Sequence, residues 1–199
     1  MRQDFKATLN FSTPIWEAVV PEYLDKMNFV SNHYLKDLKL KDETSYHSAS
    51  MVNDPSLNDF KNFCFDKSKE FLNWCGFDLT NHNLKYTEMW VQEFNKKGGG
   101  YHSSHIHPNQ HVSGFYFLKG SSQTSHPVFH DPRPGAMMIK LPEKKEEELT
   151  LANSCTHRKV VPGLMIIFPG YLSHEYLPDL GLDDFRFIHW NIQAIQKDI

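Results

Sequence analysis

The feature of this sequence that most constrains its fold is a series of short apolar segments in the second half, each ended by glycine, proline or other turn residues. The segments are rich in β-branched and aromatic residues, and no helical pattern lies between them. We expect strands at residues 86–94, 112–118, 127–129, 136–141, 148–152, 164–168 and 185–195. Strands without helices between them favour an antiparallel sandwich or jelly roll over alternating strand–helix units.

The first 85 residues have a different pattern. Apolar residues alternate over Leu9–Trp16 up to a proline, which predicts a short edge strand. A proline at position 21 begins a helix that continues weakly to Leu38, and residues 41–53 are polar and predict a loop. A stronger helix begins at Asp54–Pro55, where the aspartate can cap the first turn, and Gly76 is placed to end it.

These patterns predict a mainly β protein with N-terminal helices, built on a jelly-roll core. The apolar face of the second helix, with Phe60, Cys64 and Phe71 at helical spacing, needs a sheet to pack against. We therefore expect a single domain over residues 1–199, in which a mostly helical part, 1–85, packs on a β core, 86–199.

Composition narrows the classes of function. The net charge is −3 and lysine and arginine are scattered, so we expect no nucleic-acid partner. No apolar run is long enough to span a membrane, and the first residues lack the apolar core of a signal peptide. The three cysteines show no CxxC spacing, which argues against a disulfide framework and fits a reducing compartment. We expect a cytoplasmic protein.

Four histidines lie within residues 101–111. Side chains alternate along an extended chain, so His105 and His107 are expected to point the same way and can reach one metal ion. A third ligand has to come from elsewhere in the fold. His174 is the candidate, because a Pro-Gly turn, an apolar strand and a second Pro-Gly turn lead directly to it.

Arg186 stands among apolar residues on an expected core strand. A guanidinium in that position is costly unless it is paired, and a carboxylate is the partner that its planar fork fits best.

The order of these motifs resembles a family of 2-oxoglutarate- and iron(II)-dependent oxygenases found in bacteria and in phages of marine bacteria. The resemblance rests on His-x-His-Pro, Ser-Gly-Phe-Tyr-Phe-Leu, Asp-Pro-Arg, Pro-Gly-x-x-x-x-Phe-Pro, the later His and Arg, the opening Phe-Ser-Thr-Pro-Ile and the Trp90 strand. It covers most of the chain. It implies a double-stranded β-helix, a form of jelly roll, and, for a phage protein, the cytoplasm of the host.

Carried over residue by residue, the resemblance implies that His105 and His174 hold iron(II) and that Arg186 binds the distal carboxylate of 2-oxoglutarate. Position 107 departs from the usual His-x-Asp or His-x-Glu, and a neutral His107 in the third ligand position leaves the site one negative charge short. Tyr116 can donate a hydrogen bond to the oxo acid or be a core aromatic. The implied reaction consumes 2-oxoglutarate and molecular oxygen and hydroxylates a substrate that the sequence does not identify.

The other histidines carry less signal. His102 and His111 can orient a ligand or touch substrate, although a surface position explains both. His189 follows Arg186 by three residues and is therefore expected on the opposite side of the strand, in a structural role.

Two other hypotheses stay open. A cupin-type enzyme would use three or four histidines, with His111 and His174 joining the pair; there Arg186 is a structural ion pair and 2-oxoglutarate is not used. A non-enzymatic binding module would hold a structural metal in a closed site, or none. The N-terminal edge strand can pair with its own sheet or with a second copy, so a homodimer is compatible with the sequence.

Overall fold

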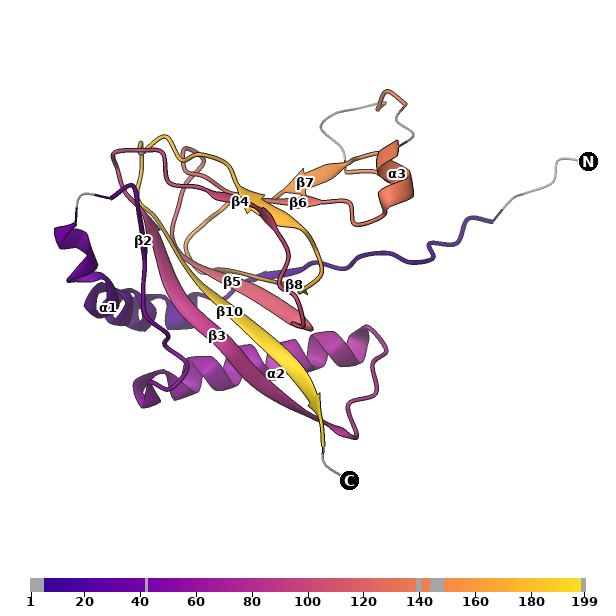
Figure 1. Ribbon diagram of the computed structural model, residues 1–199, viewed down its shortest axis with the longest axis horizontal. Coiled ribbons are helices and arrows are strands. Elements are labelled where there is room, and N and C mark those ends of the chain that lie inside the picture. Colours follow the sequence, from indigo (N-terminus) through magenta and orange to yellow (C-terminus); the bar gives the residue numbers. More distant parts are fainter. Residues whose placement is uncertain (1–5, 42, 139–140, 144–148, 198–199) are drawn as a thin grey trace, which may run out of the picture.

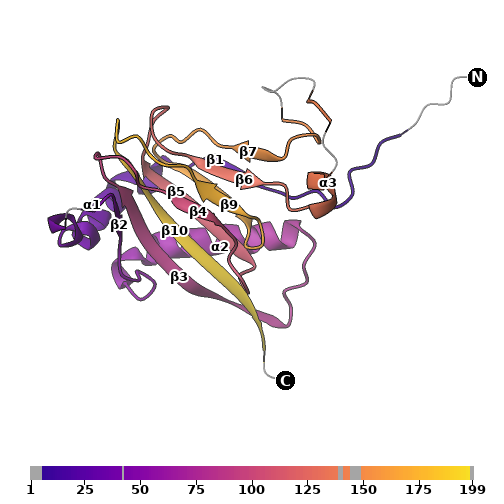
Figure 2. The same ribbon diagram turned by 45° about the horizontal axis from the view of Figure 1, so that its top comes forward.

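In the computed structural model, which describes residues 6–41, 43–138, 141–143 and 149–197, two antiparallel β-sheets face each other. One sheet has six strands in the order β1-β8-β5-β10-β3-β2, and the other has four in the order β4-β9-β6-β7. Figure 2 shows β4, β9 and β6 lying over β5 and β10. This arrangement confirms the expected antiparallel jelly roll.

The strands of the six-stranded sheet are β1 (Trp16–Val19), β2 (Ser45–His47), β3 (His82–Phe94), β5 (Val112–Lys119), β8 (Leu164–Pro169) and β10 (Phe185–Gln196). Those of the four-stranded sheet are β4 (His102–His105), β6 (Pro127–His130), β7 (Cys155–His157) and β9 (His174–Tyr176). The helices are η1 (Pro21–Tyr23), α1 (Leu24–Leu35), η2 (Leu38–Leu40), η3 (Pro55–Leu57), α2 (Asn58–Trp74) and α3 (Pro134–Met138).

Helices α1 and α2 cover the face of the six-stranded sheet that points away from the second sheet (Figure 1). The predicted cap of the second helix is present, since Asp54 Oδ1 accepts a hydrogen bond from the Ser56 backbone N–H at 2.8 Å. Gly76 follows the helix with a φ of 90°, a conformation that glycine adopts without steric cost.

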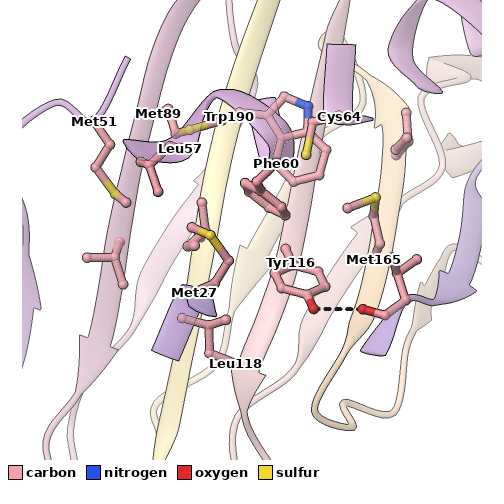
Figure 3. Close-up of a cluster of buried hydrophobic side chains, with 14 of the residues drawn as sticks. Met27, Met51, Leu57, Phe60, Cys64, Met89, Tyr116, Leu118, Met165 and Trp190 are labelled. Carbon is pink, nitrogen blue, oxygen red and sulfur yellow. Dashed lines mark hydrogen bonds between the residues drawn. The ribbon is translucent and has the colours of Figure 1, made fainter. Parts of the chain in front are cut away.

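The core under the helices combines Met27 of α1, Phe60 and Cys64 of α2, and side chains from every second position of β5 and β10. Figure 3 shows this cluster, with Tyr116 and Trp190 facing Phe60. The faces of the six-stranded sheet are thus set by parity: one set of alternate residues contacts the helices and the other set faces the second sheet.

The space between the two sheets is filled mainly by aromatic rings. Phe115 and Phe117 of β5, Phe185 and Phe187 of β10 and Tyr176 of β9 are all buried there. On β10 this places Phe187 and His189 between the sheets, while Arg186 and Trp190 face the helices.

Several expected segments are corrected by the structure. The N-terminal strand begins at Trp16, not at Leu9, and pairs with β8. Residues 136–138 belong to helix α3 rather than to a strand, and residues 149–152 form no strand. The polar stretch 41–53 contains the short strand β2. The parts of the expected strands at 139–140 and 148 lie outside the described residues.

The short strands β4, β7 and β9 were not expected, because three or four residues carry too little alternation to be recognised. Among the described residues, no helix combines the length and apolar character needed to cross a membrane.

Candidate metal centre

His105, His107 and His174 form a cluster in which one ring nitrogen of each lies within 4.8 Å of the others. His105 ends β4, and His174 begins β9 directly opposite it in the antiparallel register. Ring centroids are 4.4 Å apart for His105 and His174, 5.0 Å for His105 and His107, and 5.1 Å for His107 and His174. The three histidines chosen from the sequence are therefore brought together by the fold.

Backbone carbonyls fix the orientation of two of the rings. His105 Nδ1 lies 2.7 Å from Ser103 O, and His174 Nδ1 lies 2.9 Å from Leu172 O. A carbonyl oxygen can only accept, so each Nδ1 carries the hydrogen and each Nε2 keeps its lone pair. This is the tautomer that presents Nε2 to a metal.

His107 is positioned by a close contact between two turns. It lies two residues beyond β4, and its backbone N–H donates to Gly170 O at 2.9 Å. A Cβ on Gly170 would come within 2.4 Å of Gln110 O, so only glycine allows the turn after β8 to approach this loop.

Asn191 contacts the ring of His107 from β10. Its Nδ2 lies 3.1 Å from His107 Nδ1 and donates to Glu88 Oε2 at 2.8 Å, while Ser113 Oγ donates to its Oδ1 at 2.6 Å. In this arrangement His107 Nδ1 accepts and Nε2 carries the hydrogen. A half-turn of the Asn191 amide, with the exposed Glu88 carboxylate turned away so that two acceptor oxygens do not meet, would let Nδ1–H donate to Oδ1 and free Nε2 for a metal.

Burial makes these imidazoles hard to protonate. Burial, followed by the neighbouring imidazoles His105 and His102, lowers the pKa of His107 to about 4. The pKa of His174, which is 1 % exposed, falls to about 3, mainly because of burial. A neutral imidazole is the form that binds a metal.

His189 is a fourth histidine at this site, although we expected a structural role for it. Its ring stacks on that of His107 with centroids 4.7 Å apart. Its Nδ1 lies 3.1 Å from Gly114 O, which leaves Nε2 with a lone pair, fully buried and without a hydrogen-bond partner in the described part of the chain. Glu88, His107 and His189 form a second group of potential ligands within 4.8 Å, but Glu88 is exposed and His107 is shared with the first group.

Arg186 does not lie at the site, contrary to the expectation from the sequence. Its side chain faces the helices, where its Nε and Nη2 donate to Glu93 Oε2. Its Nη1 donates to Ser31 Oγ and Asn32 Oδ1 of α1, each at 2.8 Å. The buried guanidinium does have the carboxylate partner that its chemistry demands, but that partner is a residue of this chain.

Tyr116 also lies on the helix side, and its hydroxyl donates to Val20 O at 2.7 Å (Figure 3). It is a core aromatic with a satisfied hydroxyl.

His111 is exposed and accepts a hydrogen bond from the Ala194 backbone N–H at 3.0 Å, away from the three-histidine cluster. His102 is half-buried, stacks on Trp90 and lies beside His105, with ring centroids 6.0 Å apart.

The cluster fits a divalent transition metal. Imidazole nitrogens suit iron, zinc and copper, and three such ligands from one side leave coordination positions open for a substrate or co-substrate. His174 is buried, whereas His105 and His107 are partly exposed, so the open side faces solvent.

Asn191 is a contributor that the sequence did not single out, and His189 was expected only in a structural role. A signal was present on β10, where polar residues stand at 189 and 191, two positions apart and therefore on one face of the strand.

The comparisons with known proteins agree with this centre. Residues 88–184 match the sequence model of a family described as "Putative 2OG-Fe(II) oxygenase". The matched range contains the three clustered histidines. No curated protein matches the chain.

Solved structures share the fold at low sequence identity. A prolyl-4-hydroxylase from Pseudomonas putida has a TM-score of 0.57 and 11 % identity, with 94 % of this chain and 95 % of that chain covered. A 2OG-Fe(II) oxygenase family oxidoreductase from Burkholderia pseudomallei has a TM-score of 0.53 and 12 % identity, with 86 % and 88 % covered. HygX from Streptomyces hygroscopicus, solved with nickel and 2-oxoglutarate, has a TM-score of 0.56 and 12 % identity, with 91 % and 83 % covered. Residues 88–184 thus match the sequence model of this family, and the chain shares the double-stranded β-helix fold of these structures.

Proposed function

We propose that His105, His107 and His174 hold iron(II) and that this centre hydroxylates an organic substrate at the expense of 2-oxoglutarate. The observation that carries the proposal is the convergence of three imidazole nitrogens within 4.8 Å of one another, two of them on rings already oriented by backbone carbonyls. Iron(II) with 2-oxoglutarate and oxygen supplies the oxidation of an unactivated C–H bond, with succinate and carbon dioxide as co-products.

In this proposal the residues of the chain orient the histidine rings for the metal and keep water away from it. The carbonyls of Ser103 and Leu172 hold two rings in the tautomer that presents Nε2, and the Asn191 amide, once rotated, does the same for His107. The aromatic rings between the sheets exclude water on the buried side of His174.

A cupin-type enzyme is the second candidate, and one observation favours it: Arg186 is a structural ion pair, as that hypothesis expects. Its four-histidine set is not supported, since His111 is hydrogen-bonded to Ala194 N elsewhere. The two functions differ in whether turnover depends on 2-oxoglutarate.

The test is to add iron(II) and then 2-oxoglutarate to the protein without oxygen and to follow the metal-to-ligand absorption band. We expect the band in the wild type and its loss in His105→Ala and His174→Ala. His126→Ala is the matched control, because this half-buried histidine is paired with His157 away from the cluster. A wild type without the band, or stoichiometric iron in either alanine variant, would overturn the assignment.

We also propose that the protein is located in the cytoplasm, which for a phage protein is that of the host. We further propose that it functions without a nucleic-acid partner. Support comes from the cysteines Cys64, Cys75 and Cys155, which are all free thiols, and from the slightly acidic net charge of −3.

Strand β1 stands at the edge of the six-stranded sheet, which leaves it available for pairing with a second copy in a homodimer.

A further inference from the structure

The displacement of Arg186 leaves one end of the co-substrate without its expected partner. 2-Oxoglutarate carries two carboxylates, and a chelate with iron uses only one of them together with the keto oxygen. The second carboxylate has to be held by other groups, and burying it without a partner would be costly. The inference below rests on the proposed function and identifies those groups.

Tyr176 has the position and the unused donor that this role requires. It lies two residues beyond His174 on β9, on the same face and about 7 Å along the strand. That is the scale over which a five-carbon oxo diacid extends from a metal. Its hydroxyl is fully buried and has no hydrogen-bond partner among the described residues, which is rare for a buried polar group.

The ring of Tyr176 is held firmly. It stacks on Phe187, with centroids 4.8 Å apart and planes 18° from parallel, and its edge contacts Phe115 at 5.4 Å. The unpartnered hydroxyl therefore belongs to a fixed side chain, and the energetic cost of burying it is not explained by any contact within the described chain.

His102 of β4 lies beside the ring of Tyr176. It pairs with Tyr176 in the strand register, as His105 pairs with His174. Its ring centroid lies 5.9 Å from that of Tyr176 and 6.0 Å from that of His105. Along β4 and β9, the pair His102 and Tyr176 therefore lies next to the pair His105 and His174 of the three-histidine cluster.

The balance of charge explains why a neutral anchor can suffice. Iron(II) carries two positive charges and 2-oxoglutarate two negative ones, and three neutral imidazoles add none. The usual two-histidine, one-carboxylate set adds a negative charge, which an inward-facing cation can offset. Here His107 stands where a carboxylate is usual, and the cation at Arg186 faces the helices. Both departures together leave the loaded centre neutral.

We propose that the Tyr176 hydroxyl, with His102 beside it, holds the distal carboxylate of 2-oxoglutarate. A histidine instead of a carboxylate at position 107 removes a negative charge, and an Arg186 that faces the helices removes a positive one. The two differences from the usual site then compensate each other. Glu88, whose carboxylate lies within 4.8 Å of His107, is exposed, so water screens its charge.

The experiment compares two 2-oxo acids in iron-loaded protein without oxygen, with binding followed by the absorption band and by calorimetry. Tyr176→Phe removes only the hydroxyl. We expect it to weaken 2-oxoglutarate binding by about tenfold or more, the effect of losing one hydrogen bond to a charged group. Pyruvate, which has no second carboxylate, should bind equally to Tyr176→Phe and to the wild type. Iron affinity should not change.

Tyr116→Phe is the matched control, because it deletes a buried tyrosine hydroxyl on the other face of the sheet, where Val20 O accepts from it. It should leave 2-oxoglutarate affinity unchanged. His102→Leu should weaken 2-oxoglutarate binding and spare pyruvate. Arg186→Lys, which keeps a cation for Glu93, should leave both affinities unchanged.

Equal loss of both oxo acids in Tyr176→Phe, or no loss of either, would refute the anchor. So would a selective loss of 2-oxoglutarate affinity in Arg186→Lys. In each of these cases the wild type still binds 2-oxoglutarate, so the proposed function stands. If the wild type binds iron but neither oxo acid, the proposed function fails and the anchor with it.

Discussion

Arg186 and Glu93 lie directly opposite each other on β10 and β3, and their ion pair is enclosed on the helix-covered face of the sheet. The arginine is 1 % exposed, and Glu93 is also paired with Lys39. The pair connects helix α1 to the sheet through Ser31 and Asn32, so its role is in stability.

The two halves of this pair should differ in their effect on stability. Glu93→Gln leaves a buried guanidinium without a counter-charge and should lower the free energy of unfolding by about 3 kcal/mol. Arg186→Met should cost less, because Glu93 keeps Lys39 and is more exposed. Chemical denaturation of both variants checks the order. The reverse order would show that Lys39 does not compensate Glu93.

The charge balance predicts the behaviour of His107→Asp. An added carboxylate beside the metal should raise iron(II) affinity and lower 2-oxoglutarate affinity, each by about fivefold or more, since two unit charges 4 Å apart interact by about 1 kcal/mol even in water. Anaerobic titration with iron(II) and then with 2-oxoglutarate measures both. Parallel gains in both affinities would contradict the neutral centre.

Asn191 should act on the metal through His107. Asn191→Leu removes the amide beside His107 Nδ1, and we expect iron affinity to fall by about tenfold to a hundredfold, as is typical when the partner of a ligating histidine is lost. Asn191→Asp, which keeps an oxygen that can accept from Nδ1–H, should retain the affinity. Metal titration of the two variants shows whether Asn191 acts by orienting the His107 ring or only by packing against it. If it acts only by packing, both variants should bind iron weakly.

The cap of α2 predicts a pH effect. The hydrogen bond from the Ser56 side chain, together with that from Tyr34, lowers the pKa of Asp54 below its usual range. A carboxyl whose pKa is lowered in the folded protein stabilises it above the unfolded pKa, and this contribution is lost as the pH falls through the folded pKa. Asp54→Ala should therefore cost about 1 kcal/mol at pH 7 and less in acid.

Asp54→Asn is the control for this effect, because an amide oxygen can still accept from the Ser56 backbone N–H but cannot titrate. Its stability relative to wild type should improve as the pH falls below 4, measured by denaturation across pH 3–7. A constant difference over that range would mean that the charge of Asp54 does not contribute.

The three histidines of the cluster could be found from the sequence because their signal is local. His105 and His107 are separated by one residue, and His174 follows an apolar strand that has a Pro-Gly turn at each end. The helix with its Asp54 cap and Gly76 end was likewise predictable, since both ends are marked by residues with specific backbone roles.

The direction of the side chains on β10 was not predictable. The sequence correctly predicts that Arg186 and His189 point to opposite faces, but it does not say which face holds the site. Residues 185–192 of β10 are all buried, and apolar residues occupy both faces of the strand, so the usual alternation is lost. The buried ion pair with Glu93 depends on a register between strands that are distant in the sequence.

The histidine cluster also joins the two layers of the protein. His105 and His174 belong to the four-stranded sheet, whereas His107 lies in the loop that leads into β5 of the other sheet. A metal held by all three would act as a cross-link between the layers, closing a contact that otherwise depends on packing and on the tight approach at Gly170. Loss of the metal should thus be felt first as faster amide exchange in the loop from residue 106 to 111 and at the start of β9, while the helix-covered face keeps its protection.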